Sequence, residues 1–148
     1  MKKLFLLFFV LTSISYSQTK KDILAGNWKA TDSNGTKNKM VFSNDGFVSM
    51  TINGEFIDGK NFVVKGGKND GQKGTLKYEI DESAVPIKMD IIASGIEKGK
   101  TVEKGRLLAI LDFINNDEIK INISLNQTRA SEFNEANESN TILLQREK

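Results

Sequence analysis

The strongest constraint on the fold of this chain is the alternation of apolar and polar residues, which recurs in short segments along most of the sequence. Apolar residues fill every second position of residues 76–80, 87–91 and 119–125. A period of two places these side chains on one face of a β-strand. The turn sequences Asn44-Asp45-Gly46 and Asn53-Gly54 favour tight hairpins, because these residue types tolerate a positive φ. We therefore predict an all-β, antiparallel fold.

Hairpin-like connections predict an up-and-down barrel of about eight strands rather than a Greek-key sandwich. Residues 107–111 are apolar at every position, which predicts a strand covered on both faces. Residues 66–74 and 94–100 are expected to be polar surface loops. Residues 128–139 break the alternation and predict a short irregular or helical segment before the last strand, residues 141–146.

The N-terminus has the composition of a secretory signal peptide. Two lysines precede an apolar run, residues 4–11, and Ser15-Tyr16-Ser17 fits a cleavage site between small residues. The run is far shorter than the ~20 residues of a transmembrane helix, and its alternative is a buried N-terminal helix or strand. We predict a signal peptide over residues 1–17, one domain over residues 18–148, no transmembrane segment, and a periplasmic or secreted protein.

The residue types that the chain lacks argue against several classes of function. The chain has no histidine and no cysteine, so it lacks the commonest general base and the ligands of the usual zinc, blue-copper and haem sites. Carboxylates such as Asp81, Glu82, Asp90 and Asp112 lie beside turns or alternate with apolar residues, and no spacing singles out a catalytic pair. We expect no enzymatic activity, no metal site and no cofactor.

Net charge gives no reason to expect a nucleic-acid partner. The full chain carries 21 basic and 19 acidic residues, and residues 1–17 hold two of the lysines and no acid. The predicted mature chain is therefore close to neutral. Its charges are interspersed, which is typical of solvated strand faces.

A barrel of about eight strands encloses space for its own side chains or for one small ligand. We therefore predict that this protein binds a small apolar ligand. The candidate interior residues are Met40, Phe42, Met50, Tyr78, Met89, Ile110 and Phe113. The alternative is an exported interaction module whose barrel is filled and whose outer face binds a protein partner, with Phe47 and Phe133 as the first exposed aromatic candidates.

Several short motifs resemble those of lipocalin-like proteins from exported bacterial families. Leu24-x-Gly26-x-Trp28-Lys29 is similar to their opening strand, and three later segments match in order: Lys77-Tyr78-x-Ile80-Asp81 with Met89-Asp90-Ile91, Gly99-Lys100-Thr101, and Arg129-Ala130-Ser131-Glu132-Phe133. Two segments depart from the family pattern. Ala130 replaces a proline, and Arg106-Leu107 replaces an Ile-Tyr pair.

The resemblance implies a barrel closed at one end by Gly26, Trp28 and an arginine stacked on the indole ring. Arg146, close to the end of the chain, is the arginine that the resemblance implies, and Arg129 is the other candidate. Such a contact contributes a cation–π term of about 0.5–2 kcal/mol. These families are largely uncharacterised, so the resemblance implies a fold and no particular activity.

Overall fold

The structure is a computed structural model that describes residues 18–31, 37–52, 54–124 and 126–148. The predicted signal peptide, residues 1–17, lies outside the described residues. The elements in chain order are α1 (Lys20–Leu24), β1 (Gly26–Thr31), β2 (Lys37–Phe42), β3 (Val48–Ile52), β4 (Glu55–Ile57), β5 (Phe62–Val63), the 3-10 helix η1 (Gly67–Asn69), β6 (Lys73–Asp81), β7 (Ile87–Glu97), β8 (Lys100–Asn115), β9 (Glu118–Ser124), the 3-10 helix η2 (Glu135–Asn140) and β10 (Thr141–Arg146). Within these ranges, no helix is long and apolar enough to cross a membrane.

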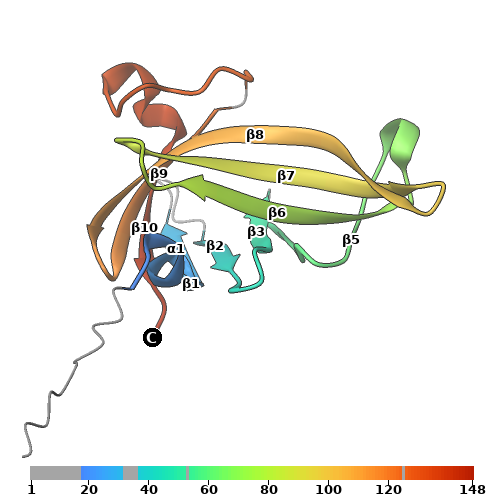
Figure 1. Ribbon diagram of the computed structural model, residues 1–148, viewed down its shortest axis with the longest axis horizontal. Helices are drawn as coiled ribbons and strands as arrows, with labels where there is room; N and C mark the ends of the chain where they lie inside the picture. Colours follow the sequence, from blue (N-terminus) through green and yellow to red (C-terminus); the bar gives the residue numbers. More distant parts are fainter. Residues whose placement is uncertain (1–17, 32–36, 53, 125) are drawn as a thin grey trace, which may run out of the picture.

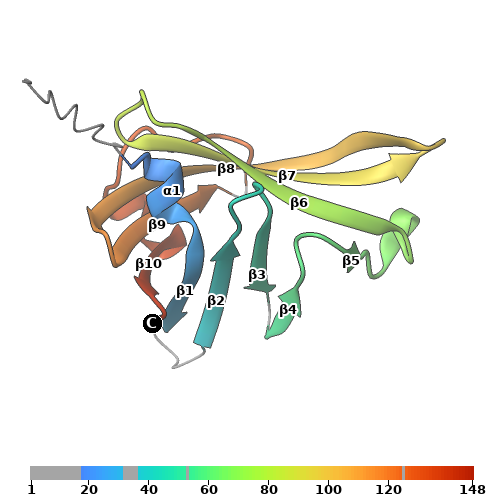
Figure 2. The ribbon, with the colours of Figure 1, turned by 60° about the horizontal axis from the view of Figure 1, so that its bottom comes forward.

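The described strands form one antiparallel sheet that curls into a nearly closed up-and-down barrel (Figures 1 and 2). The spatial order is β4-β3-β2-β1-β10-β9-β8-β7-β6-β5, so the first strand pairs with the last. The all-β, up-and-down prediction is confirmed, but the predicted number of about eight strands is wrong, since the sheet has ten. The turn at Asp58-Gly59 separates the two shortest strands, β4 and β5, and without this pair the sheet would have eight strands.

The two sides of the open sheet contact each other along β6, which hydrogen bonds to the turn after β2 and to the linker between β4 and β5. Tyr78 donates its backbone N–H to Gly46 O at 2.9 Å and its hydroxyl to Ser43 O at 3.0 Å. Leu76 N–H donates to Gly59 O at 2.7 Å. A Cβ added at Gly59 would lie 2.0 Å from Val48 O, so only glycine fits there. These contacts, which we call the seam, replace a regular ladder between the two sheet edges.

The far half of the β7–β8 hairpin extends well beyond the rest of the barrel, together with the adjoining part of β6 (Figures 1 and 2). The expected polar loop over residues 94–100 is instead mostly strand, because the β7–β8 ladder continues to the pair Glu97–Lys100. Only Lys98 and Gly99, both with positive φ, form the turn, as in a two-residue hairpin. We call residues 94–105 the arm.

One end of the barrel is closed around Trp28, which is fully buried. The guanidinium carbon of Arg146 lies 4.3 Å from the Trp28 ring centroid. Arg146 also donates to the carbonyl oxygens of Ile23, Ala25 and Asn116. Gly26 has φ +137°, and a Cβ there would lie 2.7 Å from Arg146 Nη1. Arg146 therefore occupies the position that the resemblance implied, and Gly26 leaves the space for it.

The helix α1 covers this end of the barrel. It begins with a capping box, in which Thr19 and Asp22 satisfy each other's backbone N–H groups. Its last residue, Leu24, is fully buried, and the Leu24 carbonyl accepts a hydrogen bond of 2.7 Å from Trp28 Nε1. Residues 20–24 therefore form a short capped helix that is fixed to the barrel through its last residue.

Residues 126–140, which we call the outer segment, lie on the outside of the barrel over β8 and β9 (Figure 1). Asn122, a buried polar residue on the outer face of β9, donates to Asn137 O at 2.9 Å. Arg129 donates to Met89 O and Ala109 O at 2.7 and 2.6 Å. The segment ends in η2, so a short helix does precede the last strand. Because the outer segment covers the outside of β8, residues 107–111 are apolar on both faces.

Replacing Arg146 with lysine is expected to lower the free energy of unfolding by about 2 kcal/mol. Lysine keeps the charge but cannot stack on Trp28 and reach three carbonyl groups at once. Urea denaturation of residues 18–148 measures the change. Arg106→Lys is the matched control, because Arg106 is exposed and lysine keeps its charge beside Asp90 and Glu103, so the change should cost less than about 1 kcal/mol. Equal losses in the two variants would contradict this role of Arg146.

Replacing Gly59 with alanine is expected to open the seam, since the new methyl group meets the Val48 backbone. We expect a loss of more than about 3 kcal/mol, as for severe overpacking against backbone. Gly105→Ala is the control, because nothing lies within 4 Å of its added Cβ. Thermal unfolding followed by circular dichroism should show Gly105→Ala close to the parent protein. If the Gly59→Ala protein is as stable as the parent, Gly59 is not required for the seam.

Candidate ligand pocket

A pocket of about 340 Å³ opens into the barrel at the end opposite α1, where β2 begins. Its apolar wall comes from five strands and continues the core of the barrel. The wall consists of Met40, Met50, Leu107, Ile123, Ile142 and Leu144. Met40, Met50 and Leu144 are buried, whereas the other three are half-buried and turn apolar surface toward the opening. The volume is at the lower end of the range for small-molecule sites, about 300–1,000 Å³.

Polar groups surround the mouth of this pocket. Asn38, Lys39 and Thr51 come from β2 and β3, and Ser139 and Asn140 come from the end of η2. Lys39 pairs with Glu147 at 3.3 Å, so its ammonium group is partly neutralised. The amide and hydroxyl groups can donate to or accept from a polar group of a ligand. The outer segment therefore contributes directly to the entrance.

Two of the seven predicted interior residues line this pocket, and these are Met40 and Met50, which are paired across β2 and β3. Three others are buried in the packed part of the core. Phe42 and Tyr78 form an edge-to-face pair with ring centroids 5.1 Å apart, next to the seam. Met89 is fully buried. Tyr78 has its hydroxyl hydrogen bonded, and burial raises the pKa of its phenol.

The last two predicted residues lie elsewhere. Phe113 is half-buried against the core near α1, with the Lys20 ammonium group 4.9 Å from its ring centroid. Ile110 is buried but alternates with the core residues Ala109 and Leu111, which places it on the outer face of β8. The expectation that Ile110 faces the interior therefore fails. Its apolar character reflects the cover provided by the outer segment.

Four apolar residues of the pocket wall are absent from the sequence-based candidates: Leu107, Ile123, Ile142 and Leu144. Only Ile123 belongs to a segment whose alternation indicates an inward face, whereas Leu107, Ile142 and Leu144 have apolar neighbours in sequence. Alternation predicts the face of a strand but not the height along the barrel axis. That height depends on strand register, which only the fold provides.

Asp90 anchors the outer segment to the barrel. Its carboxylate pairs with Arg129 of that segment and with Arg106 of β8. Burial raises the pKa of the Asp90 carboxyl, but hydrogen bonds and charge from Arg129 and Arg106 outweigh burial and hold the pKa below its ordinary value. Because the outer segment also forms part of the pocket mouth, Asp90 supports one wall of the entrance from a distance.

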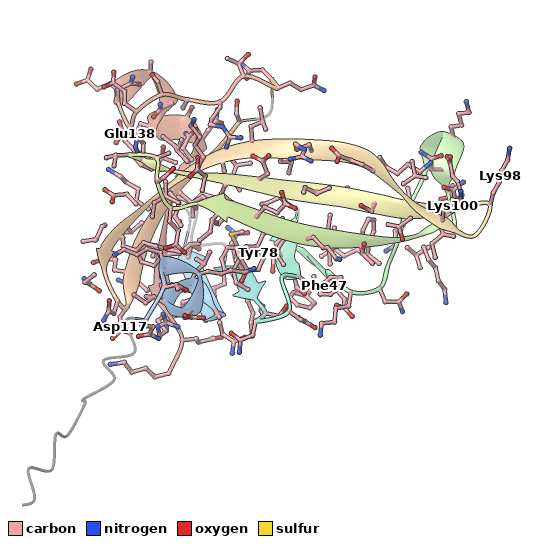
Figure 3. The ribbon with its side chains drawn as sticks, in the orientation of Figure 1. Phe47, Tyr78, Lys98, Lys100, Asp117 and Glu138 are labelled. Carbon is pink, nitrogen blue, oxygen red and sulfur yellow. The ribbon has the colours of Figure 1, made fainter. Side chains whose placement is uncertain are left out.

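The described residues contain no group of three or more aspartate or glutamate side chains arranged to hold a metal ion. The two aromatic residues predicted to be exposed are half-buried under lysines. Lys60 and Lys77 lie 5.4 and 5.2 Å from the ring centroid of Phe47 at the seam (Figure 3), and Lys120 lies 4.4 Å from that of Phe133. Among the aromatic side chains of the described residues, Phe56 is the most exposed, at 52%.

Comparisons with protein-family models, with curated proteins and with solved structures each find no match for this chain. The fold and the pocket geometry are therefore the basis for any statement about function. The lipocalin-like resemblance stays a prediction.

Replacing Asp90 with asparagine is expected to loosen the outer segment while the barrel stays folded. The change removes the carboxylate that pairs with Arg129 and leaves that half-buried guanidinium without its counter-ion. Hydrogen exchange measured by mass spectrometry should rise at least about tenfold over residues 128–140 and remain slow in β8 and β9. Glu103→Gln, which removes an exposed partner of Arg106, is the control and should leave the segment protected.

The same anchor should depend on pH. Because the pKa of Asp90 is lower in the folded protein, its stabilising effect is complete above the ordinary carboxyl value of ~4 and is lost as pH falls through the folded value. After correction for intrinsic exchange rates, the parent segment should loosen in acid. The Asp90→Asn segment should change little over the same range.

Proposed function

We propose that this protein is a non-catalytic binding barrel that holds a small, mostly apolar ligand in the pocket at its open end. The observation that supports this most directly is a recess of about 340 Å³ walled by six apolar side chains and continuous with the core. Apolar surface of this kind favours ligand burial by about 25 cal/mol per Å². The two methionines in the wall suit ligands of irregular shape.

The polar mouth suggests a ligand with one polar end. Asn38, Ser139 and Asn140 offer neutral donors and acceptors, and the charge of Lys39 is shared with Glu147. A hydroxyl, amide or carboxyl group of the ligand would stay at the mouth while its apolar body occupies the recess. Discrimination then rests mainly on the shape of the recess.

The location of this function follows from two predictions made on the sequence. Residues 1–17 have the composition of a signal peptide, and the motifs from Leu24 to Phe133 resemble lipocalin-like exported proteins. We propose a lipocalin-like carrier or sensor that acts in a periplasm or outside the cell.

The second candidate is an interaction module that binds a protein partner. It is favoured by Phe56 and Val63, which are 52% and 49% exposed on the edge strands β4 and β5. Edge strands can add a strand from another chain. In that case the pocket would be incidental, and apolar probes would not bind there with useful affinity.

Ligand binding can be tested with residues 18–148 and a fluorophore that responds to an apolar environment. We expect saturable binding at micromolar concentration, competition by fatty acids, and a change in emission from Trp28, the only tryptophan. Trp28 pairs with the pocket residue Met40, so its emission reports on this region. Ile142→Gln should weaken binding about tenfold, because it places an amide in the apolar wall.

Leu143→Gln is the matched control, since Leu143 is the next residue of β10 and is 46% exposed on the opposite face. It should bind the probe as the parent does. If the folded parent protein binds no probe, or if both variants lose binding equally, the pocket is not the site. The interaction module would then be the better description.

A further inference from the structure

The charges of this nearly neutral protein are separated in space, which its sequence alone does not reveal. Residues 60–75 and the arm, residues 94–105, together form what we call the basic lobe. The lobe contains seven lysines and three acids, whereas the rest of residues 18–148 contains sixteen acids and twelve basic residues. Figure 3 places Lys98 and Lys100 at one end of the molecule and Asp117 and Glu138 at the other.

The lysines near the tip of the lobe are not neutralised by neighbouring carboxylates. Among the described residues, Lys68, Lys73, Lys98 and Lys100 form no ion pair, and all four are exposed. Lys68 belongs to η1, which lies beside the far end of β6, β7 and β8 in both views (Figures 1 and 2). Four unpaired positive charges thus gather at one end of the protein.

Apolar side chains lie among these charges. Ile96, two residues before the turn at the tip, is 69% exposed, and Val102 on the returning strand is 36% exposed. Ile96 also borders a shallow groove of about 190 Å³ together with Lys73 and Lys60. The boundary between water and anionic lipid can accommodate all three features of this lobe. Its phosphates attract unpaired lysines, and its acyl chains accept exposed aliphatic groups on a protruding hairpin.

We propose that the basic lobe docks the protein on a bilayer that contains anionic phospholipid, with the tip of the arm at the lipid headgroups. Lys68, Lys73, Lys98 and Lys100 contact lipid phosphates, and Ile96 enters the boundary between headgroups and acyl chains. The separation of charge orients the protein, because the rest of residues 18–148, which has an excess of acids, is repelled from the same surface. A soluble polyanion would match the lysines equally well but would give Ile96 no apolar surroundings.

This docking is independent of the ligand pocket, since the arm and the pocket share no residue. Docking would keep the ligand pocket close to a bilayer, where apolar molecules concentrate. The variants that test the two proposals are therefore different. Ile142→Gln should leave vesicle binding unchanged.

Residues 18–148 can be sedimented with vesicles of phosphatidylcholine alone and with vesicles of equal parts phosphatidylcholine and phosphatidylglycerol. We expect binding to the anionic vesicles only, weakened by salt. Each lysine near an anionic surface is worth about fivefold in affinity, so Lys98→Gln/Lys100→Gln should bind about 25-fold more weakly. Lys29→Gln/Lys148→Gln removes the same charge from exposed lysines outside the lobe and should bind as the parent does.

Insertion of the tip can be measured separately because the chain has no cysteine of its own. An Ile96→Cys protein labelled with a polarity-sensitive dye should show a blue shift on anionic vesicles. Ile114→Cys, at a site that is 53% exposed near the β8–β9 turn, should show none. Three results would overturn the proposal: no vesicle binding, equal weakening in the two lysine pairs, or binding to heparin without binding to vesicles, which would indicate a soluble polyanion.

Discussion

The pairing of the first strand with the last is the interaction on which the rest of this structure depends. An antiparallel meander becomes a barrel only when its ends meet, and here β1 meets β10 while β4 and β5 are left as edges. Arg146 makes that pairing specific, because one guanidinium group stacks on Trp28 and binds carbonyl groups on both sides of the joint. The two remaining edges are then short and are held close by the seam.

Much of this architecture can be predicted from the sequence, because strand periodicity and turn chemistry are local properties. Alternation identified most strands, and the Asp-Gly and Asn-Gly turns marked the hairpins. The arm was missed because Ser94 to Lys100 has the composition of a loop, whereas a ladder begun in the barrel continues through it. The division between β4 and β5 likewise depends on the fold, since it is contact with the Val48 backbone that requires glycine at position 59.

The candidate site was predictable only in part. The face of a side chain follows from alternation, so Met40 and Met50 could be proposed, and Ile110 illustrates the limit of that reasoning. A strand covered on both faces has apolar residues at both odd and even positions. Its local sequence therefore does not distinguish residues that face the core from residues that lie under the outer segment. Leu107 and Ile142 reach the pocket because register places them at the same height on strands that are distant in sequence. The separation of charge likewise depends on tertiary placement.

The joint between β1 and β10 also sets the order of events in folding. Arg146 and Ala25 are 121 residues apart in the sequence, so the contact between them can form only when all of the intervening chain is present. Until then β1 has β2 as its neighbour on one side and an unpaired edge on the other. Contacts between residues so far apart in sequence raise the contact order and slow folding. Before this contact forms, β1–β4 and β5–β10 are two separate sheets, because β4 and β5 do not pair. Each sheet then exposes an unpaired edge that chaperones can recognise, and the pairing of β1 with β10 joins the two into one barrel.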